Sequence, residues 1–484
     1  MPGVGPIVAP GTQILWTAAE AVAATNGQAS RMDWSVSGIS IDSRTVEPND
    51  LFVALAGEKF DGHKFVGEAL NKGARAAMVN RDAGMPAEGR AVLEVEDSYA
   101  GLSDLARTAR ARTDAQIIAI TGSSGKTGVK DALASLLSGQ GPTSASRGSL
   151  NNHIGVPLSL ARLPRQAKYG IFELGMNHGG ELTELSALVR PHLALITNIG
   201  QAHMEFFAST GEIARAKAEI FSGLEPGGPA VLNMDDGQFP VLAEAANRTG
   251  AQIHGFGQAP EANTRLIQFT LGAEGSTVEA EIDGRQLIYK LKLPGRHWVF
   301  NSLAVLAAIQ EVGADLEAAA RALGQVLPGK GRGMRHQISL PGLCFELIDD
   351  SYNANPASML AALANLGTVQ PGPQGRRIAV LGDMLELGDG AGEAHGGLLG
   401  PIVANGIDLV FCVGPLMEGL FDLLGTSRRG AKGEAADQMA PVVAAQLRSG
   451  DVVLVKGSAG SRMMRIADAL RAMDMPQSRA VNGY

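Results

Sequence analysis

A series of short apolar runs, separated by segments long enough for a helix, constrains the fold of this 484-residue chain. Each run is too short to be a helix and is bounded by Gly, Asp or Asn. Uninterrupted apolar strands that alternate with helices are typical of parallel sheets buried on both faces, so the runs predict an α/β protein. They span residues 117–120, 169–174, 193–197, 230–232, 344–348, 378–381, 409–413 and 452–455.

The first of these runs leads into a glycine-rich turn with the composition of a phosphate-binding loop. Residues 119–127 read Ala-Ile-Thr-Gly-Ser-Ser-Gly-Lys-Thr, a strand and a turn followed by a Lys-Thr pair that opens a helix. The glycines let backbone N–H groups close around phosphate oxygens, Lys126 offers a positive charge, and the Thr127 hydroxyl suits Mg²⁺. Ile120 stands where the first glycine of such loops is expected. The pattern predicts a bound nucleoside triphosphate, and a glycine-rich turn without a ligand is the alternative.

The length and the pattern divide the chain into three expected domains. Residues 1–114 precede the phosphate loop and have strands and helices of their own. Residues 115–328 contain the loop, and within them residues 269–293 alternate as antiparallel strands do, with a turn at Asp283-Gly284. The third domain, 329–484, begins at a stretch rich in Gly, Lys and Arg that we expect to be a hinge.

Charge and hydropathy exclude some classes of partner. The net charge of −8 argues against a nucleic acid held by phosphate contacts alone. No run of about 18 uninterrupted apolar residues occurs, and the N-terminus has neither the basic nor the apolar region of a secretion signal. We therefore expect no membrane contact and a cytoplasmic location.

Cys344 and Cys412 both lie in apolar runs and are expected to be buried free thiols.

Polar side chains that could do chemistry lie at or beyond the ends of several predicted strands, where ligands bind in open α/β sheets. Glu173 closes an apolar strand and must be paired, protonated or bound to a cation, so Mg²⁺ and a structural salt bridge are both open. His203 lies just past another strand, where a histidine is either a ligand or a satisfied structural group. Lys217 lies on a predicted amphipathic helix over residues 211–221, and a solvated face is the simple interpretation.

Two further segments have polar groups that suit a nucleotide. Asn301 opens a predicted buried helix, where its amide could either contact an adenine edge or cap the helix. Residues 349–356 read Asp-Asp-Ser-Tyr-Asn-Ala-Asn-Pro and follow a predicted strand. That composition suits recognition of a ribose and a polar ligand, and a tight turn is the alternative.

Taken in order, these segments resemble the Mur ligases of bacterial peptidoglycan synthesis. The resemblance rests on the phosphate loop and on FELG, TNIGQAHMEFF, AKAEIF, GRHWVFN, DDSYNANP, LGDMLELG and VLVKGS, and the N-terminal block adds DSR, NDLFVALAG and DGHKF. Nearly the whole chain is covered. Two positions depart from the family pattern: Ser149 replaces a usual asparagine, and Gly128 stands where threonine is common.

The resemblance implies an N-terminal α/β uridine-nucleotide-binding domain, a central parallel sheet of the phosphate-loop ATPase type and a C-terminal Rossmann-like domain. It implies ATP and two Mg²⁺ ions, with a carbamate formed on Lys217 from CO₂. The implied catalytic residues are Lys126, His203 and Lys217, and the implied metal ligands are Thr127, Glu173, His203 and Lys217. ATP would be held by Gly122, Ser123, Ser124, Gly125, Lys126, Thr127, Asn301, Arg335 and Asp350, with Arg332 as the alternative to Arg335. The acceptor substrate would be held by Ser43, Arg44, Asn151, Asn152 and Asn177, and Lys456 and Ser458 would lie near the second substrate.

The resemblance further implies a monomer that joins D-alanyl-D-alanine to UDP-N-acetylmuramoyl-tripeptide through an acyl phosphate. The sister ligase that adds the third peptide residue usually carries Asp-Asn-Pro-Arg, which is absent here. Folylpolyglutamate synthase is not expected to have the DSR and DLFVAL segments, and a GTPase-like switch would need an Asn-Lys-x-Asp signature that is also absent. Whether the third peptide residue is diaminopimelate or lysine stays open.

Overall fold

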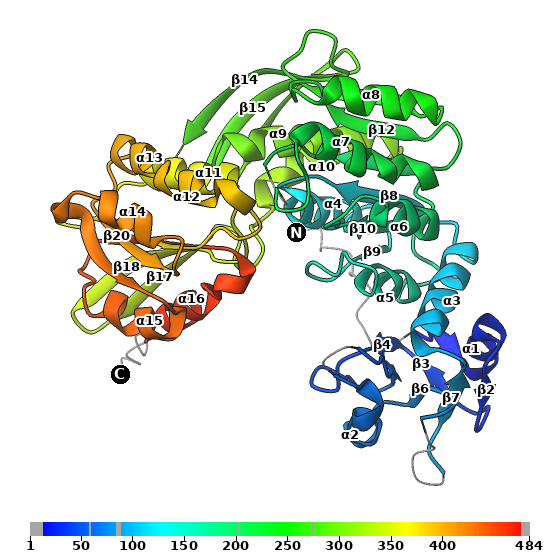
Figure 1. Cartoon of the computed structure of the whole chain (residues 1–484). Coiled ribbons are helices and arrows are strands. Elements are labelled where there is room, and N and C mark those ends of the chain that lie inside the picture. Colours follow the sequence, from blue (N-terminus) through cyan, green and yellow to red (C-terminus); the bar gives the residue numbers. More distant parts are fainter. Residues whose placement is uncertain (1–12, 58–59, 84–88, 202–203, 273–274, 476–484) are drawn as a thin grey trace, which may run out of the picture.

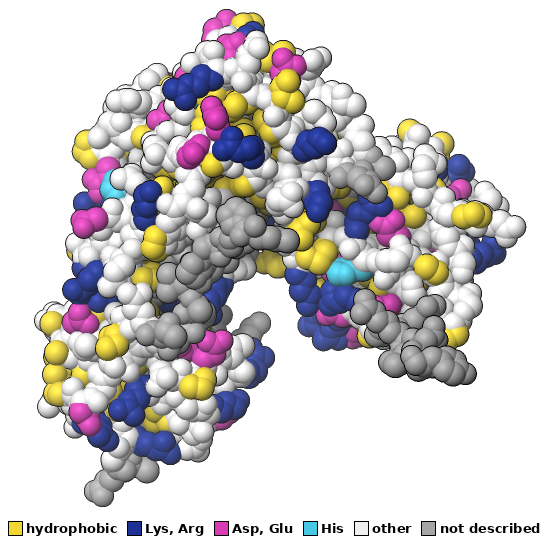
Figure 2. All heavy atoms as spheres, turned by 180° about the vertical axis from the view of Figure 1, so that it is seen from behind, with side chains coloured by type: hydrophobic (Ala, Val, Ile, Leu, Met, Phe, Trp, Pro, Cys, Tyr) yellow, Lys and Arg dark blue, Asp and Glu magenta, His cyan; other side chains and the backbone are white. Residues whose placement is uncertain are grey.

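The computed structural model describes residues 13–57, 60–83, 89–201, 204–272 and 275–475. Within these residues the chain has three parts, each built around one sheet, of five, nine and six strands in chain order. The parts form an arch, with the nine-stranded part at the top and the N-terminal and C-terminal parts as its two legs (Figure 1). Seen from behind, the space between the legs is open, with Lys and Arg side chains at its edge (Figure 2).

The N-terminal sheet has the order β2-β7-β6-β5-β4, and β4 to β7 run parallel. Its long helix, α3 (Ser98–Ala111), packs against the central part. The strands are β2 (Gln28–Ala29), β4 (Gly38–Ser40), β5 (Asp50–Val53), β6 (Ala76–Asn80) and β7 (Val92–Val95), with β1 (Trp16–Thr17) paired to β3 (Ser35–Val36). The other helices are α1 (Ala18–Thr25) and α2 (Val66–Asn71).

The central sheet has the order β16-β15-β14-β13-β12-β11-β8-β10-β9. It is parallel from β9 to β14 and ends in the antiparallel strands β14 to β16. The expected turn at Asp283-Gly284, where both residues have positive φ, joins β15 to β16. Its strands are β8 (Gln116–Thr121), β9 (Thr143–Ala145), β10 (Tyr169–Glu173), β11 (Leu193–Ile196), β12 (Pro229–Asn233), β13 (Gln252–Gly257), β14 (Thr264–Gly272), β15 (Gly275–Ile282) and β16 (Arg285–Leu291). Its helices are α4 (Lys126–Ser138), α5 (Gly155–Ala161), α6 (Glu181–Val189), α7 (Thr210–Ala218), α8 (Phe239–Arg248), α9 (Arg296–Glu311) and α10 (Leu316–Ala322).

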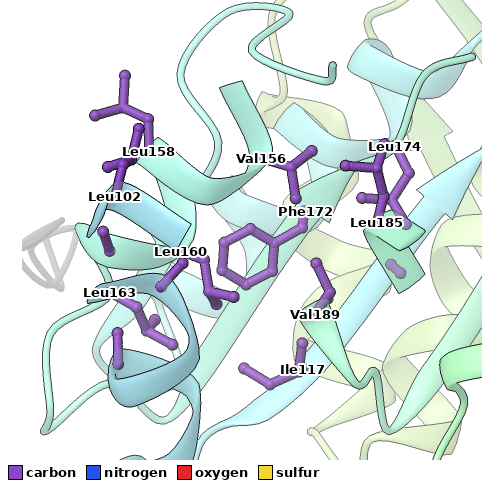
Figure 3. Packing of buried hydrophobic residues seen from close by; sticks show 14 of the residues in the cluster. Leu102, Ile117, Val156, Leu158, Leu160, Leu163, Phe172, Leu174, Leu185 and Val189 are labelled. Atoms are coloured by element: carbon purple, nitrogen blue, oxygen red, sulfur yellow. The ribbon is translucent and has the colours of Figure 1, made fainter. Parts of the chain in front are cut away.

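Alternation along β8 explains why the central strands are apolar throughout. Ile117 and Ala119 belong to one buried cluster, with α5 and α6, while Ile118 and Ile120 belong to another, with α4 and α9. Both faces of the sheet are therefore covered, as the apolar runs predict. Figure 3 shows Phe172 of β10 surrounded by side chains of α5 and α6, and Leu102 of α3 close to those of α5.

The C-terminal sheet has the order β17-β18-β22-β19-β20-β21, parallel except for the antiparallel edge strand β17. Its strands are β17 (Met334–Leu340), β18 (Leu343–Asp350), β19 (Arg377–Gly382), β20 (Leu409–Val413), β21 (Arg429–Gly433) and β22 (Val452–Lys456). Its helices are α11 (Pro356–Thr368), α12 (Ala391–Gly396), α13 (Leu399–Ala404), α14 (Glu418–Leu423), α15 (Ala436–Ala444) and α16 (Met464–Arg471).

Every apolar run identified in the sequence is a strand, but the expectation that both cysteines are buried is only half right. Cys412 is buried in β20, whereas Cys344 is exposed. Cys344 lies at the start of β18, whose neighbour β17 is an edge strand, so the sheet does not enclose it. Among the helices that the structure describes, none is both long and apolar enough to cross a bilayer.

Candidate active site

The turn between β8 and α4 has a backbone that only glycine allows at its first position. Gly122 has a φ of 147°, and a Cβ added there would lie 1.9 Å from Oγ1 of Thr197. Gly125, with a φ of 82°, precedes the first residue of α4. The turn therefore brings the N-terminus of α4 to the carboxyl end of β8, the arrangement that binds phosphate.

Neighbouring groups hold the turn in place. The Oδ1 atom of Asn198, just beyond β11, accepts a hydrogen bond of 3.0 Å from the backbone N–H of Ser124. The hydroxyl of Ser123 donates to the carbonyl of Gly200 at 3.1 Å. Lys126 folds back over the turn and donates to the carbonyl of Gly122 at 2.7 Å. The loop is thus preorganised, and its lysine lies where phosphate charge would be neutralised.

Glu173 ends β10 beside this turn and is 1% exposed. Its Oε2 atom accepts a hydrogen bond of 2.6 Å from the Thr127 hydroxyl, and its Oε1 atom accepts one of 2.7 Å from the Asn151 amide. Its hydrogen-bond partners are thus a hydroxyl and an amide. A carboxylate and a hydroxyl that meet in this way offer the oxygen ligands that Mg²⁺ prefers.

Lys217 lies on α7 and is 1% exposed, so the interpretation as a solvated surface lysine is wrong. Burial, together with the positive charge of Lys126, holds the pKa of the Lys217 ammonium well below its usual range. A lower pKa increases the fraction of the uncharged amine, which is the form that reacts with CO₂. His203, the other metal ligand expected on this side, lies outside the described residues.

Asn301 lies in the second turn of α9, because that helix begins at Arg296. The alternative that Asn301 caps the helix is therefore wrong. Its amide packs against the phosphate turn, since a Cβ on Gly125 would lie 3.0 Å from Oδ1 of Asn301. Asn301 also lines the cavity described next, where its amide can reach a ligand.

A cavity of about 810 Å³ lies between the phosphate loop and the C-terminal part. From the C-terminal side, Arg332 donates a hydrogen bond of 2.9 Å to the Thr127 hydroxyl, and its guanidinium lies 4.2 Å from the centre of the Tyr352 ring. Asp350, at the end of β18, accepts from Lys456 at 2.8 Å. The cavity is lined by predicted site residues from both parts: Ser123, Ser124, Gly125, Lys126, Thr127, Asn151, Glu173, Asn301, Arg332, Asp350 and Lys456.

Arg335 lies elsewhere. It is on the edge strand β17, and its Nη2 donates to Glu346 of β18 at 2.9 Å. Arg335 does not line the cavity, whereas Arg332, the alternative from the sequence, does. Arg332 lies within the glycine-rich stretch and Arg335 lies two residues after it, at the start of β17. The sequence pattern alone does not show which of the two faces the cavity.

A second cavity, of about 1000 Å³, lies between the N-terminal part and the central part. Asp42 and Thr45 line it, on either side of the predicted substrate residues Ser43 and Arg44. Arg44 is bound to the Asp42 carboxylate at 2.7 Å. This cavity is therefore lined by residues of both parts, as expected for a ligand that contacts the first and the second domain.

The remaining predicted substrate residues have structural partners. The side chain of Asn152 accepts hydrogen bonds from the backbone of Ile154 and Gly155 at the start of α5. The backbone N–H of Asn177 donates to Glu181 at 3.0 Å. Three other residues contribute contacts here. The sequence marks Asn198 as a polar group at the end of a strand, without a specific task, and places Tyr352 in the segment 349–356. No sequence pattern singles out Lys130.

No three His, Cys, Asp or Glu side chains gather as a metal site among the residues that the structure describes. The Thr127 hydroxyl and the Glu173 carboxylate nevertheless fit Mg²⁺, because this ion keeps several waters and is commonly bound by one or two protein oxygens together with substrate phosphates.

Comparison with known proteins covers all three parts of the chain. Family models match at residues 35–110 (Mur ligase family, catalytic domain), 120–309 (Mur ligase middle domain) and 338–459 (Mur ligase, glutamate ligase domain). The chain is 35% identical over 467 residues to UDP-N-acetylmuramoyl-tripeptide–D-alanyl-D-alanine ligase from Escherichia coli, covering 92% of this chain and 96% of the relative.

Two solved structures are similar along nearly the whole chain. MurF from Acinetobacter baumannii has a TM-score of 0.79 at 32% identity, covering 94% of this chain and 99% of that one. MurF from Thermotoga maritima in complex with ADP has a TM-score of 0.73 at 27% identity, covering 90% and 97%.

Proposed function

The chain belongs to the Mur ligase family and adds D-alanyl-D-alanine to UDP-N-acetylmuramoyl-tripeptide in peptidoglycan synthesis, and we propose that it does so through an acyl phosphate formed at the nucleotide cavity. The observation that carries the activity is the match, over nine-tenths of both chains, to a ligase named for these substrates. The phosphate loop and its cavity support ATP as the source of energy.

The chemistry explains why ATP is needed. A carboxylate is a poor electrophile because it is already anionic and resonance-stabilised. Transfer of the γ-phosphoryl group of ATP to the tripeptide carboxylate gives an acyl phosphate and ADP. The amine of D-alanyl-D-alanine then attacks the acyl carbon, the amide bond forms, and phosphate leaves. Water would hydrolyse the acyl phosphate, so a cavity enclosed by two domains protects it.

In this proposal each residue around the phosphate loop has one task. Lys126, together with the backbone N–H groups of the loop, offsets the charge of the transferred phosphoryl group. Asn301 and Asp350 contact the nucleoside, and Arg332 reaches the phosphates from the C-terminal side, in place of Arg335. Mg²⁺ held by Thr127 and Glu173 would neutralise charge between the phosphates and the acceptor carboxylate. Glu173 is oriented for this by its bond to Asn151.

Lys217 has a separate task. As an ammonium, Lys217 would repel a metal ion. Reaction of its neutral amine with CO₂ gives a carbamate anion instead and releases a proton. The depressed pKa of Lys217 favours that reaction. The carbamate and the imidazole of His203 would complete the oxygen and nitrogen ligands for a second Mg²⁺.

The larger cavity supports binding of the uridine-linked sugar–peptide, because residues of the first and second domains line it. Ser43 and Arg44 would hold this substrate from the first domain, and Asn151, Asn152 and Asn177 from the second. None of these five lines the larger cavity itself, and Asn151 lines the nucleotide cavity. Lys456 and Ser458 are proposed to lie near the dipeptide. We further propose that the enzyme acts in the cytoplasm as a monomer of three domains, 1–114, 115–328 and 329–484, without nucleic-acid or membrane partners.

An amine panel tests the function. Phosphate release is measured with ATP, Mg²⁺, UDP-N-acetylmuramoyl-tripeptide and one amine at a time: D-alanyl-D-alanine, D-alanine, diaminopimelate, lysine or L-glutamate. We expect the dipeptide to have the highest kcat/KM. A site built to pair its extra peptide group leaves polar groups unsatisfied with a single amino acid, which costs roughly 1–3 kcal/mol per group. A single amino acid that equals the dipeptide would make the chain a sister ligase.

A further inference from the structure

A single stretch of backbone, residues 146–151, forms part of the boundary of both cavities. Ser146, Arg147, Gly148 and Leu150 line the larger cavity, while Ser149 and Asn151 line the nucleotide cavity. We call residues 146–151 the shared wall. Its turn is tight, since the N–H of Leu150 donates to the carbonyl of Arg147. Any shift of the wall therefore changes the shape of both cavities at once.

Lys130 holds the backbone of this wall through hydrogen bonds from its buried ammonium. It lies on α4, one helical turn after Lys126, is 1% exposed and lines neither cavity. Its Nζ donates to the carbonyl of Ser146 at 2.8 Å and to that of Gly148 at 2.6 Å, and it lies 3.1 Å from the Asp131 carboxylate. An ammonium has three donors; two are used on the backbone of the wall, and the Asp131 carboxylate lies within ion-pair distance. Burial of a charge is costly, and these contacts are what offset that cost.

The wall in turn holds the reactive groups. The hydroxyl of Ser146 accepts a hydrogen bond of 3.0 Å from the backbone N–H of Glu173. Asn151 donates to the carboxylate of the same residue, and the carbonyl of Asn151 accepts from Gly175 at 2.7 Å. On the C-terminal side, the hydroxyls of Ser149 and Tyr352 are hydrogen-bonded. The wall therefore contacts Glu173, whose carboxylate accepts a hydrogen bond from Thr127, and it also contacts Tyr352 of the C-terminal part.

We propose that Lys130 is a positioning residue that fixes the shared wall, so that the cavity for the uridine-linked substrate and the cavity for ATP keep one relative alignment. Lys130 touches no reacting atom in this role and acts through Ser146 and Asn151 on Glu173. The inference rests on the proposed function for the identity of the two ligands, but the contacts of Lys130 do not depend on it.

The test compares two lysine-to-methionine variants of the full chain. Lys130→Met keeps the length and apolar stem of the side chain but leaves the carbonyls of Ser146 and Gly148 without their donor. Lys168→Met removes an exposed lysine of the same part and is the control. The measured quantities are kcat, the KM values for UDP-N-acetylmuramoyl-tripeptide and ATP, and the Kd of ADP with Mg²⁺ by calorimetry.

For Lys130→Met we expect a rise of at least about tenfold in KM for UDP-N-acetylmuramoyl-tripeptide and a similar fall in kcat, because a displaced wall misaligns the substrate. We expect the Kd of ADP to change less than about threefold, since the phosphate turn keeps its own braces from Asn198 and Gly200. An unchanged KM, with kcat reduced only by the unfolded fraction, would make Lys130 merely structural. An equal loss of ADP affinity would assign it to the phosphate loop instead.

Two further measurements keep the inference testable if Lys130→Met folds poorly or the substrates prove wrong. Ser146→Ala leaves the ammonium in place and removes the link to the Glu173 N–H, so we expect the same selective rise in KM. Wild-type KM values in that variant would overturn the route through Ser146. Hydrogen exchange of the amides of residues 146–152 needs no turnover, and we expect it to be at least about tenfold faster in Lys130→Met. Unchanged exchange would overturn the role of Lys130, whereas absent turnover in the wild type would overturn only the function.

Discussion

Three lysine side chains around the phosphate loop have the same charge but different partners. Lys126 bonds to its own loop, Lys130 to the carbonyls of the shared wall, and Lys217 is buried beside the positive charge of Lys126. The partners decide the chemistry that each can do. A lysine that neutralises phosphate needs exposure to the ligand, a lysine that positions backbone needs acceptors, and a lysine that reacts with CO₂ needs a low pKa.

At the residue scale, we predict that Lys217→Ala lowers kcat at least about a hundredfold and that a short carboxylic acid such as formate restores part of it, because the acid replaces the missing carbamate.

For the wild type, removing CO₂ from the buffer should reduce activity reversibly. Carbamate formation consumes neutral amine and releases a proton, so lowering the pH should deepen this loss. Phosphate release in CO₂-depleted buffer between pH 6 and 8 measures it.

An arginine on the exposed face of the same helix gives the control for that variant. Arg215→Ala should leave kcat near the wild-type value and should not respond to formate. If Lys217→Ala is fully active, or if CO₂ removal has no effect at any pH, Lys217 does not carry a carbamate.

A second residue-scale prediction separates two nearby arginines. Arg332→Ala removes the guanidinium that contacts Thr127 at the nucleotide cavity, so kcat/KM for ATP should fall about ten- to a hundredfold. Arg335→Ala should stay within about threefold of wild type, because Arg335 pairs with Glu346 away from that cavity and partly exposed pairs contribute little. Steady-state kinetics at varied ATP decides it, and the reverse order of effects would restore Arg335 as the phosphate ligand.

At the scale of elements, the sequence predicts the strands well and the helix starts less well. The strands are continuous apolar runs buried on both faces, a signal that needs only local composition. Asn301 was expected to open a helix, but α9 begins at Arg296. The residue before the helix is Gly295, which has no capping side chain, so the sequence does not mark this boundary. Burial of Lys217 was not predictable locally, since the groups that surround its side chain, among them the charge of Lys126, lie far away in the sequence.

The element-scale prediction concerns the turn between β8 and α4. Gly122→Ala should destabilise the protein by at least about 2 kcal/mol and abolish ADP binding, because φ is 147° and the new Cβ would meet Thr197. Gly139→Ala, at the other end of α4, is the matched control. Its φ is −71° and the added Cβ would make an ordinary contact, so we expect a neutral effect or a gain of up to about 1 kcal/mol. Denaturant unfolding and ADP calorimetry measure both, and equal effects would contradict the argument.

At the scale of the whole molecule, both cavities lie between parts of the arch rather than within one part. The larger cavity has walls from the N-terminal and central parts, and the nucleotide cavity has walls from the central and C-terminal parts. Figure 2 shows open space between the two legs. Ligands in these cavities contact two parts each, so binding energy can be used to draw the legs together.

Small-angle scattering tests that consequence. A compact chain of this length would have a radius of gyration of about 23 Å, and an arch should exceed it. We predict that ADP, Mg²⁺ and UDP-N-acetylmuramoyl-tripeptide together reduce the radius of gyration toward that value, because each ligand bridges two parts. Tyr352→Ala should compact less, since Tyr352 packs on Arg332 and bonds to Ser149 across the nucleotide cavity. Tyr352→Phe keeps the ring under Arg332 and loses only the hydroxyl, so it should fall between the two. Identical scattering of the wild type with and without ligands would mean that the legs do not close, and that the acyl phosphate is protected from water within the cavity as it stands.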